Sequence, residues 1–105
     1  MEHCIGIDIG GTEVKGVLCG GDGTSIRESR ERTDIASGAE GVLRVVHTVL
    51  DSLMDSTRVI RAVGIGTAGR INASTGDVVY ATENLPGWMG INIPRELQLS
   101  VPVFV

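Results

Sequence analysis

The chain has 105 residues, of which 42% are hydrophobic and 21% charged, and its formal net charge at pH 7 is −4. This length allows one compact domain with a single core, and the composition argues against a long disordered region. The nine Lys and Arg residues are scattered and outnumbered by acidic ones, so we expect no binding to nucleic acid or to a membrane. The amino terminus has no secretion-signal pattern, which favours a cytoplasmic location.

Three strands joined by glycine turns are predicted at the start of the chain. Residues 4–9 alternate apolar with small or polar side chains, which is the period-two pattern of a strand. Residues 10–12 predict a tight turn and residues 13–19 a second strand. After a turn at 20–23, a third and more polar strand is expected over 24–33. The three strands should form an antiparallel meander.

An amphipathic helix is predicted next. Ser37 and Glu40 have the spacing of a capping box, in which each side chain accepts a hydrogen bond from a free backbone amide. The apolar residues behind them recur at spacings of three and four, which indicates one helix face that packs on a sheet. These residues are Val42, Val45, Val46, Val49, Leu50 and Leu53.

The rest of the chain predicts further strands and a short helix. Residues 59–66 favour a fourth strand, 78–81 a short strand, 94–99 a short helix and 101–105 the start of a last strand. Leaving out the short strand, the order is β-β-β-α-β-α-β, which differs from the strict alternation of a doubly wound nucleotide fold. We therefore expect an α/β domain with a mixed sheet, of the actin-like ATPase (ribonuclease H-like) type.

A candidate phosphate site lies at the first turn. Asp8 ends the first strand, and Gly10 and Gly11 have no side chain that would block a phosphate. Backbone amides at such a turn, with the Thr12 hydroxyl, form an anion cradle, and Asp8 could hold a hydrated magnesium ion. If the two strands pair about this turn, residues whose numbers sum to 23 lie opposite, which places Lys15 beside Asp8. The alternative is an ordinary hairpin with a cross-strand ion pair.

The same register places Cys4 beside Cys19. Two cysteines at this spacing are too few for a zinc motif, and a cytosolic chain would keep them reduced. We expect both to be core residues without a chemical role.

The stretch from Gly64 to Gly69 matches the dinucleotide fingerprint G-x-G-x-x-G. That fingerprint requires a helix starting at its glycines, whereas the residues that follow have turn composition. We therefore reject a dinucleotide site. Gly66 and Gly69 are expected to let a small polar ligand approach the backbone, with Arg70 beside it; the alternative is a tight connection with a surface arginine.

A third candidate segment runs from residue 81 to Trp88. Thr82, Glu83 and Asn84 offer donors and acceptors suited to sugar hydroxyls. Trp88 could form a wall of a sugar site, but a buried anchor for the loop is the preferred interpretation.

Taken together, residues 6–12, 64–70 and 81–88 resemble the ROK family, which unites sugar kinases such as glucokinase and N-acetylhexosamine kinases with related transcriptional repressors. The resemblance covers nearly the whole chain. Its first motif is shared by the wider actin-like kinase superfamily, whereas the later stretch is more specific to this family. The resemblance implies ATP-dependent phosphorylation of a hexose or N-acetylhexosamine hydroxyl.

The resemblance also implies two sets of site residues. Those expected to meet the ATP phosphates, with magnesium held at Asp8 through water, are Asp8, Gly10, Gly11, Thr12 and Lys15. Those expected to line the sugar site are Gly66, Gly69, Arg70, Thr82 and Asn84. The family's zinc-binding His and Cys cluster is expected outside this segment, and a full-length member is expected to be a homodimer.

The catalytic base of ROK kinases is an Asp in an Asn-Asp pair just after the strand that begins here at Val101, and this sequence stops at Val105. We therefore expect residues 1–105 to be the amino-terminal lobe, inactive alone. The alternative is the sugar-sensing domain of a ROK-type repressor. A helix-turn-helix ahead of the first motif, as in repressor members, does not fit the few residues before Ile5. A different actin-like ATPase and a nucleotide-binding dehydrogenase are further alternatives.

Overall fold

The structure is a computed structural model that describes residues 2–105. In this part of the chain, strands and helices follow one another in the order β-β-β-α-β-β-β-α-β. No helix in this range is long and apolar enough to span a membrane. The elements are β1 (Glu2–Ile9), β2 (Glu13–Gly20), β3 (Ser25–Arg32), α1 (Gly38–Leu53), β4 (Val59–Thr67), β5 (Arg70–Asn72), β6 (Asp77–Tyr80), α2 (Ile93–Leu97) and β7 (Val103–Phe104).

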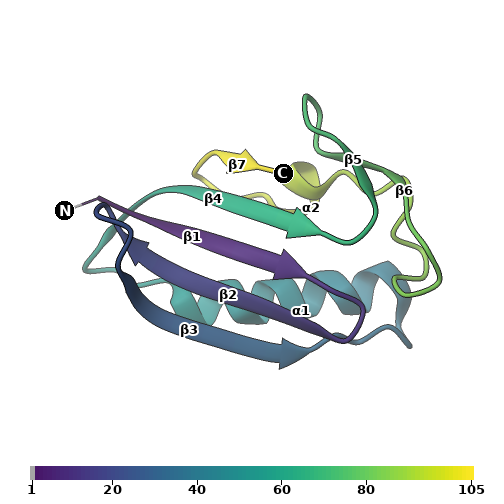
Figure 1. Cartoon of the computed structure of the whole chain (residues 1–105), viewed down its shortest axis with the longest axis horizontal. Coiled ribbons are helices and arrows are strands. Elements are labelled where there is room, and N and C mark those ends of the chain that lie inside the picture. Colours follow the sequence, from purple (N-terminus) through teal and green to yellow (C-terminus); the bar gives the residue numbers. More distant parts are fainter. Residues whose placement is uncertain (1) are drawn as a thin grey trace.

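A five-stranded mixed sheet in the order β3-β2-β1-β4-β7 forms the centre of the domain (Figure 1). β1 pairs antiparallel with β2, as β2 does with β3, whereas β1 and β4 run parallel, as do β4 and β7. The predicted α/β class and the mixed sheet are therefore confirmed. The predicted register is also confirmed, since Asp8 lies opposite Lys15 and Cys4 opposite Cys19. A turn of three residues fixes this register, because a slip by one residue would turn the apolar side chains away from the core.

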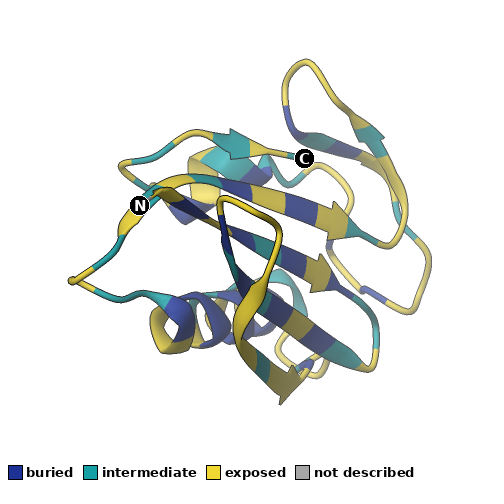
Figure 2. Cartoon of the chain, turned by 60° about the vertical axis from the view of Figure 1, so that its left-hand side comes forward, coloured by how far each residue is buried: buried dark blue, intermediate teal, exposed yellow. Residues whose placement is uncertain are grey.

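Helix α1 covers one face of the sheet. Along β1 and β2, buried and less buried residues alternate (Figure 2), because successive side chains of a strand point to opposite faces. The buried set packs against the apolar stripe of α1, which includes Val46 and Leu50. Burial of each large side chain contributes about 1.5–3 kcal/mol. Gly16 leaves room for the helix, since a Cβ there would lie 2.6 Å from both Val49 Cγ1 and Leu53 Cδ1.

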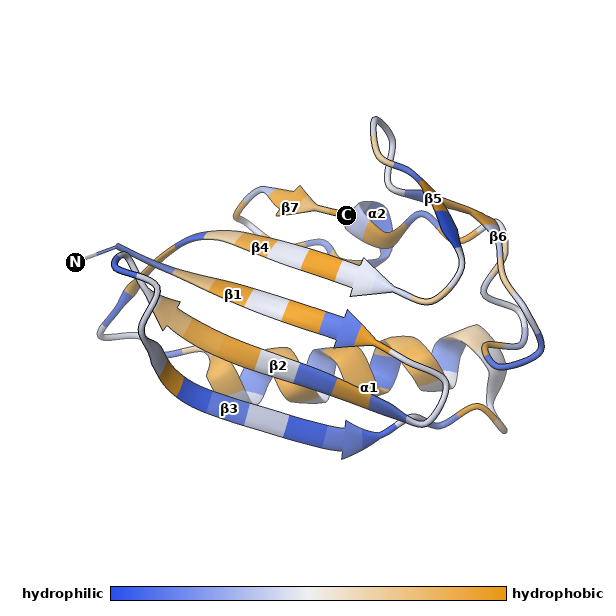
Figure 3. Cartoon of the chain, in the orientation of Figure 1, coloured by the Kyte–Doolittle hydropathy of each residue, from blue (hydrophilic) through white to orange (hydrophobic). Residues whose placement is uncertain are grey.

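The opposite face of the sheet, which we call the open face, carries glycines and charged residues. β3 is hydrophilic over most of its length (Figure 3), and Gly6 of β1 pairs with Gly64 of β4 at the middle of this face. A Cβ added at Gly64 would meet nothing within 4 Å. The residues that define the open face are Gly6, Asp8, Glu13, Lys15, Val17, Glu28, Arg30, Gly64 and Gly66.

A second, smaller unit follows β4. β5 and β6 form a two-stranded sheet. The segment after β6 contributes Leu85, Trp88, Ile93 and Leu97 to the common core. α2 begins after Asn92, whose side chain accepts a hydrogen bond from the Arg95 amide at 2.9 Å. The strand β5 was not predicted, because its three residues lie within a stretch of turn composition. The strand β6 corresponds to the short strand predicted over 78–81, which the predicted order β-β-β-α-β-α-β leaves out. That order therefore lacks two strands that the structure contains.

Two further predictions were wrong in detail. Ser37 precedes α1 as expected, but its side chain makes no capping hydrogen bond; its amide instead donates to Asp34 Oδ1 at 3.3 Å, and Arg44 also pairs with that carboxylate. Cys4 and Cys19 are not core residues: Cys4 is exposed and Cys19 half-buried. Both lie on the open face, where their strand positions place them.

Candidate functional site

The candidate site lies at one edge of the sheet, where the parallel strands β1 and β4 both end. Asp8 of β1 lies beside Gly66 of β4 in the parallel register. One residue beyond β4, the Ala68 amide donates to the Ile9 carbonyl at 3.0 Å. The turn after β1 and the loop after β4 are thereby held together, as expected for carboxyl ends of neighbouring parallel strands.

The hairpin turn, residues 10–12, presents free backbone donors. The Gly10 amide donates to the Glu13 carbonyl at 3.0 Å, whereas the amides of Gly11 and Thr12 make no hydrogen bond within residues 2–105. Gly11 also packs closely against the later loop, because a Cβ there would lie 2.8 Å from the Asn84 carbonyl oxygen. Free amides at a turn of small residues are suited to an anion.

Thr33 holds this turn from the side of β3 and was not identified from the sequence. It is 6% exposed, and its hydroxyl donates to the Gly10 carbonyl at 2.7 Å. Its amide donates to the Thr12 carbonyl at 2.9 Å. The β2–β3 register places Thr33 opposite Thr12, but a register shift between Leu18 and Cys19 hides this pairing from the sequence spacing.

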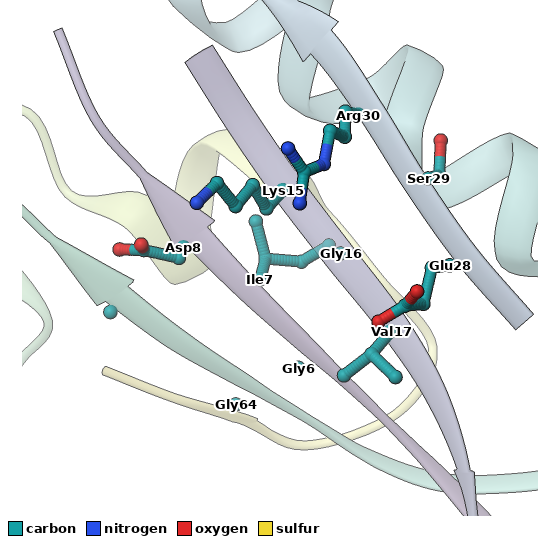
Figure 4. Close-up of a pocket in the computed structure, with 11 residues that line it drawn as sticks. Gly6, Ile7, Asp8, Lys15, Gly16, Val17, Glu28, Ser29, Arg30 and Gly64 are labelled. Carbon is teal, nitrogen blue, oxygen red and sulfur yellow. The ribbon is translucent and has the colours of Figure 1, made fainter. Parts of the chain in front are cut away.

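A hollow of about 470 Å³ opens on the open face next to the turn. Asp8, Lys15 and Gly66 line it together with Arg30, and Figure 4 shows Lys15 and Arg30 on neighbouring strands on the same side as Asp8. Lys15 Nζ pairs with Glu13 Oε1 at 3.3 Å. The alternative expectation of an Asp8–Lys15 ion pair is not met within residues 2–105. Asp8 therefore keeps its carboxylate accessible.

Asp8 meets the requirements for one magnesium ligand. Its side chain is exposed, and Gly66 leaves space beside it, since a Cβ at Gly66 would lie 3.8 Å from Asp8 Oδ1. Mg²⁺ keeps several waters and takes only one or two protein carboxylates when phosphates supply the remaining ligands. No three His, Cys, Asp or Glu side chains gather as a metal cluster in the described part of the chain.

The glycine loop after β4 leads into the strand β5 and not into the helix that the dinucleotide fingerprint requires. Gly69 has φ +104°, and a Cβ there would lie 2.4 Å from the Tyr80 carbonyl oxygen, so other residues would be strained. Arg70 follows as the first residue of β5, opposite Tyr80, and its side chain is exposed.

The loop of residues 82–88 is anchored to the glycine loop. The Trp88 side chain is buried, and its Nε1 donates to Thr67 Oγ1 at 3.0 Å, which confirms the prediction of a buried anchor. The Asn84 amide donates to Thr82 Oγ1 at 3.3 Å, and the residue itself is exposed.

The predicted site residues are brought to one end of the domain but not into one cavity. Gly66 shares its hollow with Asp8 and Lys15, whereas Thr82 lines a separate hollow of about 400 Å³ beside residues 85–89. Gly69, Arg70 and Asn84 line neither. Asn84 is nevertheless in contact with the hairpin turn through Gly11. The two predicted sets therefore meet at two places, where Gly66 lies beside Asp8 and where Asn84 lies beside Gly11.

A mixed sheet in the order β3-β2-β1-β4-β7, with a glycine hairpin that joins the inner strands β1 and β2, has the actin-like (ribonuclease H-like) fold. Residues 4–105 match the ROK family model. The chain belongs to the ROK family.

Known relatives agree with this assignment. The chain is 30% identical to the glucokinase of Thermotoga maritima over 93 residues, which cover 89% of this chain and 29% of that protein. It superimposes on an inorganic polyphosphate/ATP-glucomannokinase from Arthrobacter with a TM-score of 0.80 and 28% identity, covering 98% of this chain and 43% of that one. A ROK family glucokinase from Streptomyces griseus, in complex with glucose and AMPPNP, gives a TM-score of 0.84 at 24% identity, covering 98% and 32% of the two chains.

A regulator shares the same fold. A ROK family transcriptional regulator, a homologue of the Escherichia coli MLC protein, gives a TM-score of 0.72 at 18% identity, covering 99% of this chain and 27% of the regulator. The chain spans about a third of the length of the relatives that it matches in sequence.

Proposed function

We propose that this chain is the amino-terminal, phosphate-binding lobe of a sugar kinase. In the whole protein, this kinase transfers the γ-phosphoryl group of ATP to a hydroxyl of a hexose or N-acetylhexosamine. Membership of the ROK family, the glucokinase relative and the likeness to the Arthrobacter kinase support this proposal.

One juxtaposition carries the proposal. The free amides of Gly11 and Thr12 lie at the end of the same hairpin whose strands carry Asp8 and Lys15 on the open face. Phosphoryl transfer asks a protein chiefly for positioning and for stabilisation of charge. Backbone donors, a cation and a carboxylate that suits magnesium meet this demand.

In this mechanism the hairpin turn binds and orients the phosphates. The amides of Gly11 and Thr12 donate to phosphate oxygens, and the Lys15 ammonium offsets their charge. Asp8 would hold the magnesium ion through water, and the bound ion would neutralise charge on the phosphates. Thr33 keeps the turn in place through its two hydrogen bonds to Gly10 and Thr12.

The sugar would bind to Gly66, Gly69, Arg70, Thr82 and Asn84. The close approach of Gly11 to the Asn84 carbonyl supports a sugar site directly beside the phosphates. Such proximity is what transfer between two bound substrates needs. The base that accepts the hydroxyl proton is proposed to lie outside residues 1–105, together with the second lobe and the zinc site. We further propose that the whole protein is a cytoplasmic homodimer.

A coupled ATP-consumption assay over a panel of hexoses and N-acetylhexosamines tests this function. The assay compares residues 1–105 with a longer protein that carries the native downstream sequence. We expect the longer form to phosphorylate one sugar and the short form none. The variant Asp8→Asn in the longer form should lose most of the activity, at least about 100-fold, if this carboxylate organises the phosphates.

Two results would count against a kinase. A longer form that binds a sugar without consuming ATP would favour the sugar-sensing domain of a ROK-type repressor. A longer form that hydrolyses ATP equally with and without every sugar would favour an actin-like ATPase of another class.

A further inference from the structure

Two cations on the open face share one carboxylate oxygen. Lys15 Nζ lies 3.3 Å from Glu13 Oε1, and Arg30 Nη1 lies 3.8 Å from the same atom. Lys15 and Arg30 face each other across β2 and β3 in the strand register. A single anionic oxygen is therefore held between two positive groups at the edge of the hairpin turn.

Arg30 borders two hollows. It lines the hollow of about 470 Å³ that contains Asp8 and Lys15, and also a hollow of about 240 Å³ that contains Thr12 and Arg32. The second hollow lies on the β3 side of the turn, away from the glycine loop. Thr12 of the turn and Arg30 therefore line one hollow, together with Glu13 and Glu31.

Glu13 is the carboxylate that both cations meet, and Asp8, Glu28 and Glu31 also line the two hollows. The side chain of Arg30 is 68% exposed, so its guanidinium remains accessible to a ligand. An arginine fork is well suited to phosphate oxygens, because it can donate two hydrogen bonds in parallel. A phosphate oxygen has the same charge and acceptor character as the oxygen of Glu13.

We infer that Lys15 and Arg30 form a second contact point for the condensed phosphate chain of the phosphoryl donor. The Glu13 carboxylate occupies this contact point until a phosphate group displaces it. The inference rests on the proposed function, because it extends the phosphate site at the hairpin turn. It assigns Arg30 and Glu13 to donor binding, with opposite effects: Arg30 attracts the chain and Glu13 competes with it. Both nucleoside triphosphates and inorganic polyphosphates carry this chemistry.

The test is a titration of the isotope-labelled protein followed by NMR, with two probes, ATP and inorganic tripolyphosphate. The amides of residues 10–12 report contact with the turn, and the Arg30 Nε–H signal reports the second contact. We expect Arg30→Gln to raise the dissociation constant of both probes about fivefold, as is typical for one exposed charged contact. We expect Glu13→Gln to lower it about threefold.

A matched ion pair at the other end of the same sheet supplies the control. Arg61 Nη1 pairs with Glu2 Oε1 at 3.1 Å, and the arginine is 65% exposed. Arg61→Gln and Glu2→Gln should leave both dissociation constants within about 1.5-fold of the original, because these residues lie far from the turn. If Arg30→Gln fails to fold, Arg30→Lys keeps the charge and should weaken binding less than twofold.

The possible outcomes separate the inference from the function on which it rests. Equal effects on both probes identify the phosphate chain as the contacted group, and an effect on tripolyphosphate alone also supports the contact and points to an inorganic donor. An effect on ATP alone would overturn the inference, since the nucleoside would then be the contacted group. The inference would also be overturned if the Glu13→Gln variant bound the two probes no more tightly than the original protein, because Glu13 would then only bridge two strands. If the NMR signals of the amides of residues 10–12 do not shift with either probe, this result would instead contradict the proposed function.

Discussion

The two faces of the five-stranded sheet differ in what holds them in place. On the covered face, Gly16 contacts α1 so closely that even a Cβ would lie 2.6 Å from its side chains, and Leu18 is fully buried. On the open face, Gly64 has nothing within 4 Å of a Cβ, and Val17 is only half-buried. Neighbouring residues of one strand thus serve different purposes. Stability depends on the covered face, whereas the proposed phosphate site depends on the open face and on the hydrogen bonds of the turn.

The strongest test of this comparison exchanges one glycine on each face for alanine. We expect Gly16→Ala to lower the free energy of unfolding by about 1–3 kcal/mol, because the new methyl group overpacks the interface with α1. Gly64→Ala should change it by no more than about 0.5 kcal/mol in either direction, since space is available and a strand glycine is itself unfavourable. Urea unfolding followed by circular dichroism measures both.

The two alanine variants also test the separation of purposes. Gly16→Ala acts on the covered face and should not change the hydrogen bonds of the hairpin turn, so its folded fraction should bind tripolyphosphate as the original protein does. Equal stability losses for the two variants would show that the open face is packed as tightly as the covered one.

A smaller effect is expected at the turn itself. Thr33→Val keeps the shape of the side chain but removes the hydroxyl that donates to the Gly10 carbonyl at 2.7 Å. We expect a loss of about 1 kcal/mol in unfolding free energy. Hydrogen exchange at the Gly10 amide should become about fivefold faster if local opening dominates.

Thr48→Val is the matched control for Thr33→Val. The Thr48 hydroxyl donates to the Arg44 carbonyl at 3.0 Å on the exposed side of α1, away from the turn. Its loss should leave the Gly10 amide unchanged. If hydrogen exchange at the Gly10 amide became faster in both variants, the cause would be a global loss of stability. Thr33 would then not hold the turn in place.

The smallest expected effect concerns acid, and it arises at the ends of α1 rather than on the open face. Hydrogen bonds from Thr57, assisted by Arg58, lower the pKa of Asp55 to about 2, and bonds from Ser37 and Arg44 lower the pKa of Asp34. In the unfolded chain these carboxylates have a pKa of ~3.9. The folded state binds fewer protons, so their stabilisation is present above pH ~4 and is lost as the pH falls toward 2.

Asp55→Asn tests this acid dependence. The variant should lose less stability between pH 4 and pH 2 than the original protein in urea titrations at each pH. The same slope in Asp55→Asn as in the original protein would contradict the role given to this carboxylate.

Much of the sheet could be predicted from local signals. The strands β1 and β2 follow from period-two alternation, and the short glycine turn fixed their register to the residue, so that Asp8 and Lys15 were paired correctly. The helix α1 followed from its apolar stripe. The burial of Trp88 was also predicted, since a lone tryptophan in a structured loop usually anchors it.

The features that were missed depend on contacts between distant segments. The three residues of β5 have no strand pattern and are paired only because β6 lies beside them. Thr33 gains its importance from the turn that it meets across β2 and β3. Cys4 looked like a core residue because its neighbours are apolar, yet strand alternation turns it to the open face. Sequence pattern alone also could not say that the predicted sugar residues do not line one common cavity.

The hydrogen bond from the Trp88 indole to Thr67 has a practical consequence. Trp88 is the single tryptophan of the sequence, and it lies in an apolar setting next to the loop that follows β4. Its fluorescence emission is therefore a built-in optical reporter, with the short wavelength of a dry indole in the folded state. A ligand that rearranges the glycine loop will alter the emission without any label, and complete unfolding will shift it to the red, so one signal can distinguish occupancy from denaturation.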